Sequence, residues 1–327
     1  MKALRFDRIG SLDYLKILDV RNPEAGQGCV LVRVMAAALN PSDAKNVLGK
    51  MEETTVPRIP GRDFAGVVAV GTDAYPEGAE IFGTGGSLGF NRDGSHAELI
   101  EVPVEAIKPK PRSLTFEQAA SVGIPYLTAC RAVVEAASLQ PGETILITGI
   151  TGTVGDAAAR IAKRICKANV IGAVRSHVDT VRLQLTDYVD DWVDVGSGTL
   201  AEQIRSKTGG RGVNAILDVV GGALFEPCLK SLAFRGCHVA IASQPERKVV
   251  FDLIDFYHNE SVLRGVDSIK TSFSDVDRIL TLLLPYFESG DFGPPKELIP
   301  VGFDGVLNAY RELSEGRATG KYVFVPD

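Results

Sequence analysis

The pattern of hydrophobic and polar positions along the chain changes near residue 123. Before about residue 122, short apolar or alternating segments such as Val30 to Ala36 and Gly66 to Val70 are separated by glycine-containing turns, which is typical of strands. After it, strand-like segments alternate with segments of helical period. The strand-like segments are residues 144–148, 169–174, 192–195, 214–220, 237–242 and 261–266. This alternation predicts an α/β fold with a parallel sheet covered on both faces.

The helical segments support a division into two domains. In the first helical segment, the apolar positions fall on one face that would pack on the sheet. They are Val154, Ala158, Ile161, Ala162 and Ile165. After about residue 268 the alternation gives way to two further helical segments and a last strand, Lys321 to Val325. We expect this tail to return to the first domain. The prediction is a discontinuous domain of residues 1–122 and 268–327, a domain of residues 123–267, and an active cleft between them.

A glycine-rich turn follows the apolar strand Thr144 to Ile147. Its sequence runs Gly149-Ile150-Thr151-Gly152-Thr153-Val154-Gly155 and leads directly into the first helical segment. Glycines let a pyrophosphate approach the backbone, and the start of a helix attracts an anion. The turn departs from G-x-G-x-x-G, because Ile150 stands at the first glycine's position. The predicted dinucleotide contacts in this turn are Gly149, Gly152, Thr153, Val154 and Gly155.

Residues after the later strands complete the predicted dinucleotide site. Arg175 and Ser176 follow the second strand, where an acidic residue would suit the ribose diol of NAD, and a cation there suits the 2′-phosphate of NADP. Ligands of open α/β sheets sit at the carboxyl ends of strands. This adds the residues that close two further strands as coenzyme contacts: Asp218, Val219, Gly221, Ala242 and Ser243.

The amino-acid composition limits the classes of partner that the protein can bind. The 327 residues are 45% hydrophobic and 23% charged, enough for two ordinary cores. The formal net charge of −6, without a basic run, excludes a nucleic-acid partner. No apolar segment approaches the length of a membrane span or a signal sequence, so we expect a cytoplasmic protein that is not bound to a membrane. The 5 scattered cysteines predict free thiols.

Several motifs, in order along nearly the whole chain, resemble the medium-chain dehydrogenase/reductase superfamily. They are Asn40-Pro41-Ser42-Asp43, Pro60 to Gly66, Thr128-Ala129, the glycine turn, Asp218 to Gly222, and Gly320-Lys321. The resemblance is to the zinc-free quinone oxidoreductase and enoyl reductase branch. It implies a GroES-like β-barrel catalytic domain, a Rossmann domain, and a homodimer or homotetramer. The strand at 262–266 could pair across the two-fold axis.

The zinc alcohol dehydrogenases of this superfamily differ from the chain at two ligand positions. They carry a cysteine in the segment corresponding to 36–43 and Gly-His-Glu where this chain has Gly61-Arg62-Asp63. A catalytic Zn²⁺ needs three protein ligands, and an arginine in a ligand's place would repel the cation. We therefore expect no metal.

The resemblance implies a catalytic role for Asn40 and Thr128 near the nicotinamide, where both also contact the coenzyme, with Lys321 as a further coenzyme contact. Asn40 could orient a substrate oxygen, or could be only a turn residue before Pro41. Asp43 could line the pocket or cap a helix beginning at Ala44. Related enzymes place a tyrosine where this chain has Met51, which leaves the proton donor open.

Without a metal, hydride transfer to a conjugated acceptor is the easiest chemistry, because charge spreads to a distant oxygen that hydrogen-bond donors can stabilise. The sequence thus predicts a zinc-independent NADPH-dependent oxidoreductase acting on a quinone or an α,β-unsaturated carbonyl. Two alternatives stay open: an acyl-CoA-type enoyl thioester reductase, and a catalytically idle NADPH-binding protein.

Overall fold

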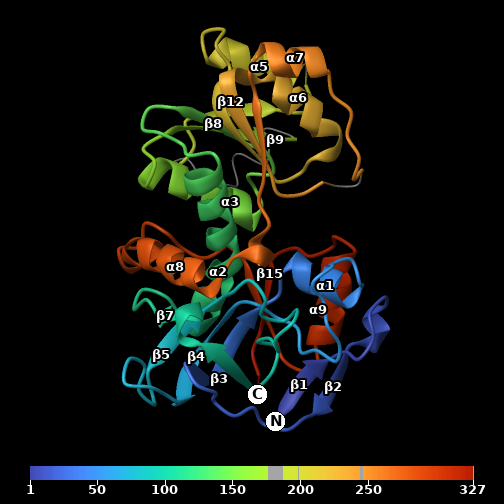
Figure 1. Ribbon diagram of the computed structural model, residues 1–327, viewed down its shortest axis with the longest axis vertical. Coiled ribbons are helices and arrows are strands. Elements are labelled where there is room, and N and C mark those ends of the chain that lie inside the picture. The colour runs from blue at the N-terminus through green and yellow to red at the C-terminus, as the bar shows by residue number, and fades with distance from the viewer. Residues whose placement is uncertain (176–186, 198, 244–245, 327) are drawn as a thin grey trace. The chain divides into compact units, whose positions relative to one another are not determined.

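The computed structural model describes residues 1–175, 187–197, 199–243 and 246–326 (Figure 1). The chain forms two compact units. Unit 1 consists of Met1–Leu127 and Ser268–Asp327, and unit 2 of Thr128–Asp267, so the division falls within helix α2 (Phe116–Cys130). None of the helices in the described parts is long and apolar enough to cross a membrane.

Unit 2 is built on a six-stranded sheet in the order β10-β9-β8-β11-β12-β13, in which every pairing is parallel. Its strands are β8 (Thr144–Ile147), β9 (Asn169–Val174), β10 (Asp191–Asp194), β11 (Val213–Asp218), β12 (Leu232–Ala240) and β13 (Val262–Gly265). The order reverses between β8 and β11, so the turn after β8 lies at the switch point where doubly wound sheets bind ligands. The predicted parallel sheet is confirmed.

Helices cover both faces of this sheet. They are α3 (Thr153–Arg164), α5 (Leu200–Lys207), α6 (Phe225–Lys230) and α7 (Leu253–His258), and a π-helical segment (Arg131–Ala136) follows α2. Leu146 packs in one core with Ile204 of α5 and Phe225 of α6. Its neighbours Ile145 and Ile147 point to the opposite face, as strand geometry requires, and are also fully buried. Figure 1 shows α5, α6 and α7 grouped together, apart from α3.

Most predicted strand ends differ from the structure by one or two residues, and the differences at the end of β11 and the start of β12 have a visible cause. β11 ends at Asp218 rather than at residue 220, because the Asp218 carboxylate accepts hydrogen bonds from the N–H groups of Val220 and Gly221 and bends the chain into a turn. β12 begins at Leu232 rather than at 237, because Leu232 already pairs with Val213 of β11 before the register shifts. The predicted apolar face of α3 is correct at its centre: Ala158, Ile161 and Ala162 are fully buried.

Unit 1 contains a seven-stranded sheet in the order β14-β15-β3-β4-β5-β7, with β6 also paired to β3, and a β1-β2 hairpin. Its strands are β1 (Lys2–Arg5), β2 (Lys16–Asp19), β3 (Cys29–Ala38), β4 (Phe64–Val70), β5 (Glu80–Gly83), β6 (Leu99–Pro103), β7 (Ile107–Pro109), β14 (Leu298–Val301) and β15 (Lys321–Phe324). The tail therefore adds its last strand to the first part's sheet, since β15 pairs with β3.

Among the residues that the structure describes, unit 1 has three α-helices besides the start of α2. They are α1 (Pro41–Val47), α8 (Phe273–Glu288) and α9 (Val306–Ser314). The helix expected from Ala44 begins earlier, because a proline is well suited to the first helical position. The buried residues of α8 are Val276, Ile279, Leu280, Leu283 and Phe287. The cysteines are free thiols, as predicted.

Candidate functional site

The glycine turn of unit 2 has two closely packed glycines and one open one. Gly149 has a φ of +56°, and a Cβ there would overlap the side chain of Val219. A Cβ on Gly155 would lie 2.5 Å from the Gly149 carbonyl oxygen. In contrast, a Cβ on the exposed Gly152 would meet only the Gly149 oxygen, at 3.3 Å. The open space at Gly152 is the kind of cradle that a phosphate group requires.

Helix α3 starts at this open glycine. Gly152 is the N-cap residue in an extended conformation, and its carbonyl accepts the Asp156 N–H at 2.9 Å. The next N–H groups are those of Thr153, Val154 and Gly155, which belong to the helical turn whose donors lack intrahelical partners. The positive end of the helix therefore faces the same opening. These residues fit a dinucleotide pyrophosphate.

The Asp218 carboxylate organises the neighbouring strand end. One oxygen accepts the Thr148 hydroxyl at 2.7 Å and the Gly221 N–H at 2.9 Å, and the other lies 3.3 Å from Nε2 of His238. Burial alone would raise the Asp218 pKa, but the hydrogen bonds from His238, Gly221 and Thr148 hold the pKa below its ordinary value. The carboxylate is fully buried, so it shapes the turn around Val219.

The predicted coenzyme contacts of unit 2 lie at adjoining strand ends. Gly221 has a φ of +69°, and a Cβ there would lie 2.5 Å from the Ala242 oxygen and 2.7 Å from Cα of Ser243. A Cβ built on Gly149 would lie 2.4 Å from Cγ2 of Val219, so this turn lies close to the end of β11. The structure thus brings together the ends of β8, β11 and β12.

Three other predicted site residues are Arg175, Ser176 and Thr128. Arg175 is exposed directly after β9, the strand that pairs with β8. Ser176 lies outside the described residues. Thr128 is buried in the last turn of α2.

Asn40 and Lys321 meet in unit 1. The Lys321 ammonium donates to Oδ1 of Asn40 at 2.6 Å, and Nδ2 of Asn40 donates to Oδ2 of Asp63 at 2.9 Å. Asn40 is 4% exposed, Lys321 7% and Asp63 fully buried. Asn40 ends the link from β3 to α1, Asp63 directly precedes β4, and Lys321 starts β15. Three segments distant in sequence thus form one polar network, which we call the Asn40 network.

Asp63 is fixed from its other side. Its Oδ1 accepts the Thr84 hydroxyl at 2.6 Å and the Ile124 N–H at 2.8 Å. Gly123 makes room for it, since a Cβ at that position would overlap Oδ1. Burial raises the Asp63 pKa, while the nearby Lys321 charge and the bonds from Thr84 and Asn40 oppose that rise. Burial likewise lowers the Lys321 pKa.

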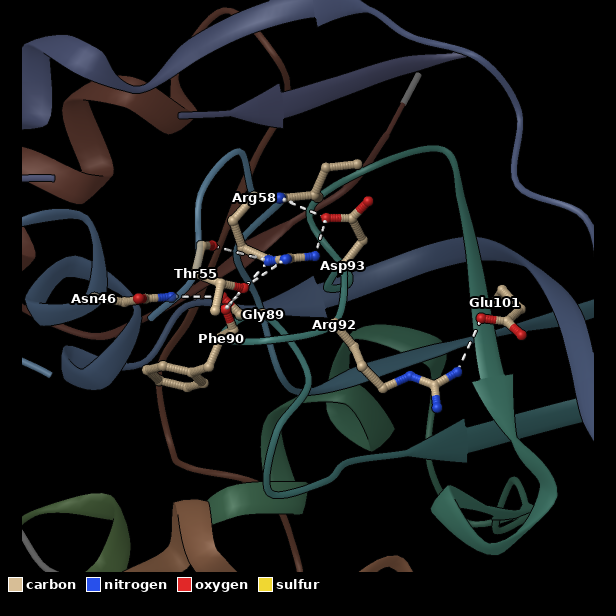
Figure 2. Close-up of polar contacts among 9 residues, drawn as sticks. Asn46, Thr55, Arg58, Gly89, Phe90, Arg92, Asp93 and Glu101 are labelled. Atoms are coloured by element: carbon tan, nitrogen blue, oxygen red, sulfur yellow. Dashed lines mark hydrogen bonds and ion pairs between the residues drawn. The ribbon is translucent and has the colours of Figure 1, made fainter. Parts of the chain in front are cut away.

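Arg62 is a second buried cation beside this network. It is 1% exposed, donates to the Ser268 hydroxyl at 3.1 Å and to the Ser268 carbonyl at 3.0 Å, and its guanidinium carbon lies 5.6 Å from the centre of the Phe90 ring. Figure 2 shows how the Phe90 loop is held: Asn46 donates to the Gly89 carbonyl, and Arg58 donates to the Phe90 carbonyl and pairs with Asp93. The buried Phe90 ring therefore packs against the Arg62 guanidinium.

Asp43 lies at the start of α1, where it receives the Asn40 backbone N–H at 2.7 Å on Oδ2. The expected capping role is therefore present. Its Oδ1 has no hydrogen-bond partner among the described residues, and burial raises the Asp43 pKa to about 7. Nearby, burial lowers the His96 pKa to about 4, and Nδ1 of His96 lies 2.6 Å from the Tyr310 hydroxyl.

The residues at the zinc-ligand positions do not fit Zn²⁺. A catalytic zinc needs three thiolate, imidazole or carboxylate ligands, whereas the Asn40 network offers one carboxylate, already bonded by Asn40 and Thr84, with Arg62 close by. Over the ranges that the structure describes, no group of three or more His, Cys, Asp or Glu residues is placed to hold a metal.

Sequence reasoning singled out Asn40 and Lys321 separately. It missed the hydrogen bond between them and the hydrogen bond from Asn40 to Asp63. The available signal was Arg62-Asp63 directly before the apolar run from Phe64. Charged residues beside a buried strand need charged or hydrogen-bonding partners inside the protein.

Comparisons with known proteins agree with both units. The family described as alcohol dehydrogenase GroES-like domain matches residues 26–112, and the family described as zinc-binding dehydrogenase matches 153–283. A zinc-type alcohol dehydrogenase-like protein of Schizosaccharomyces pombe is 32% identical over 96% of this chain and 94% of its own.

Two further similarities bear on function and fold. An NADPH-dependent alkenal/one oxidoreductase of Arabidopsis thaliana is 29% identical, covering 100% of this chain and 80% of its own. The crystal structure of an NAD-dependent alcohol dehydrogenase superposes with a TM-score of 0.86 at 26% identity, covering 99% of each chain. The predicted GroES-like and Rossmann-like domains are therefore confirmed.

Proposed function

Because the chain belongs to the medium-chain dehydrogenase/reductase superfamily, on its quinone oxidoreductase-like branch, we propose that it is a zinc-independent, NADPH-dependent reductase of quinones or α,β-unsaturated carbonyls. The observation that carries the proposal is the Asn40 network. Where the resemblance places zinc ligands, this chain holds a neutral amide between a lysine and an aspartate. A hydrogen-bond donor of this kind suits an acceptor whose charge is delocalised.

In this proposal unit 2 binds the coenzyme. The open side of Gly152 and the N–H groups of Thr153, Val154 and Gly155 take the pyrophosphate, and the turns at Gly149, Val219, Gly221, Ala242 and Ser243 form the surrounding wall. Asp218 shapes that wall from inside, Thr128 offers a hydroxyl, and Arg175 and Ser176 meet the 2′-phosphate. When bound, the coenzyme supplies the hydride.

Asn40 is the catalytic residue of the proposal. Its amide N–H donates to the acceptor oxygen as negative charge develops there, which stabilises the transition state without a metal. The similarity to an NADPH-dependent alkenal/one oxidoreductase supports a conjugated carbonyl as the acceptor class. Pairing of two chains through the edge strand β13, whose Val262 and Leu263 are exposed, stays a prediction, as does a cytoplasmic location.

A panel of acceptors tests this proposal. We expect the purified protein to consume NADPH, followed by its absorbance, with a quinone or an enone. Crotonyl thioester as the preferred substrate would favour the enoyl thioester reductase. NADPH binding without turnover of any conjugated acceptor would favour an idle binding protein, and activity confined to simple ketones or alcohols would contradict the mechanism.

Arg175→Ala tests the choice of coenzyme. A charge-assisted hydrogen bond is worth about 1.5–3 kcal/mol, so the Kd for NADPH should rise about 10-fold or more while the Kd for NADH stays unchanged. Fluorescence titration of both coenzymes measures this. Lys230→Ala, which removes another cation of unit 2 on α6, is the control and should change neither affinity. Equal affinities of the wild type for NADPH and NADH would refute the assignment.

A further inference from the structure

We propose that Lys321 and Asp63 are positioning residues that lock the Asn40 side chain in one orientation, so that it can act toward the substrate only as a hydrogen-bond donor. The inference rests on the proposed function, because it concerns the residue that would meet the acceptor oxygen. It also gives Lys321 a role through Asn40, different from the coenzyme contact expected of it.

The two ends of the amide face opposite charges. Oδ1 accepts from the Lys321 ammonium at 2.6 Å, and Nδ2 donates to the Asp63 carboxylate at 2.9 Å. A half-turn of the amide would set its NH₂ group against an ammonium, which has only donors, and its oxygen against a carboxylate, which has only acceptors. Both charge-assisted bonds would be lost and two repulsions gained. One orientation is therefore strongly preferred.

Both charged partners are themselves fixed. Asp63 is held by the Thr84 hydroxyl at 2.6 Å and the Ile124 N–H at 2.8 Å. Lys321 is the first residue of β15, and its backbone N–H donates to the Glu297 carbonyl at 2.8 Å. Asp63 is fully buried and Lys321 is only 7% exposed, so neither side chain has the space to follow a rotating amide. The orientation is set by the fold before any ligand binds.

In this arrangement the Asn40 side chain can act toward a ligand only as a hydrogen-bond donor. Oδ1 is occupied by the ammonium, while Nδ2 carries two hydrogens and gives one hydrogen bond within the described parts of the chain. The ammonium at Oδ1 also polarises the amide, which strengthens its remaining N–H as a donor. Such preorganised donors are worth about 10²–10³-fold in kcat. Lys321 contributes to that factor without touching the substrate.

A double-mutant cycle in the full-length protein separates positioning from general support of the fold. The four proteins are the wild type, Lys321→Met, Asn40→Ala and the double variant, assayed with the best acceptor at saturating NADPH. We expect Lys321→Met to lower kcat about 10-fold in the wild type and to have no further effect in the Asn40→Ala background. Equal fold-losses in both backgrounds would overturn the inference, as would a Lys321→Met kcat within about twofold of the wild type.

Two further measurements keep the test decisive. Lys321→Gln replaces Lys321→Met if the latter does not fold, and Lys321→Arg, which retains the cation, should recover most of kcat. The side-chain amide signals of Asn40 in NMR report its orientation without any turnover: we expect slow hydrogen exchange in the wild type and faster exchange in Lys321→Met. Unchanged signals would overturn the positioning role. A wild type inactive on every conjugated acceptor would instead refute the proposed function and leave the NMR result to decide the inference.

Discussion

Gly155→Ala should lose NADPH binding by about 100-fold or more, equivalent to about 3 kcal/mol. The added Cβ would lie 2.5 Å from the Gly149 carbonyl oxygen and 2.6 Å from Cα of Ile150, both backbone atoms of the turn itself. The start of α3 must then move away from the turn. Because the first N–H groups of α3 and the turn together form the proposed phosphate cradle, this movement separates the donors from their ligand.

Gly152→Ala separates ligand contact from packing within the turn. Its Cβ meets only one protein atom, at 3.3 Å, so the melting temperature should stay close to that of the wild type while the Kd for NADPH rises. Gly305→Ala is the matched control. Gly305 is also an N-cap glycine, at α9, and its Cβ would make only ordinary contact with Val301, at 3.6 Å. Calorimetric titration with NADPH checks all three variants. Normal affinity in Gly152→Ala would contradict the assignment of the cradle.

The parallel sheet was predictable because its signals are local. The prediction for β9 was correct at both ends, residues 169–174, because the strand is a short apolar run bounded by turn residues. The prediction for β11 failed at its end, because what stops that strand is a side chain: Asp218 captures the next N–H groups for itself. A hydrophobic pattern contains no information about such a capture.

The Asn40 network shows a different limit. Asn40, Asp63 and Lys321 are brought together only when β15 pairs with β3 and β4 pairs with β3. No spacing along the chain links residue 321 to residue 40. The resemblance singled out Asn40 and Lys321 one by one, but the contact between them depends on sheet pairing. The glycine turn, in contrast, is a continuous segment, and its residues could be named in advance.

Asp63→Asn is expected to destabilise unit 1 by about 3–5 kcal/mol, the typical cost of leaving a buried charge without its compensating charge. The carboxylate accepts hydrogen bonds from Asn40, Thr84 and Ile124, and the Lys321 and Arg62 cations both stabilise its charge. An asparagine keeps the shape of the side chain but lacks its negative charge, so the charges of Lys321 and Arg62 are less well compensated. Asp93→Asn is the control: Asp93 pairs with Arg58 but is 59% exposed, so its loss should cost about 0–1 kcal/mol.

The pH dependence of this loss identifies its cause. Burial already lowers the folded-state pKa of Lys321, and removing Asp63 takes away a charge that raises it. A folded state that binds fewer protons than the unfolded state gains stability as the pH rises, up to the ordinary lysine pKa of 10.5. The deficit of Asp63→Asn, measured by urea unfolding, should therefore shrink from pH 7 toward pH 10. A deficit that is constant over this range would mean that lost hydrogen bonds, rather than the uncompensated Lys321 charge, account for the destabilisation.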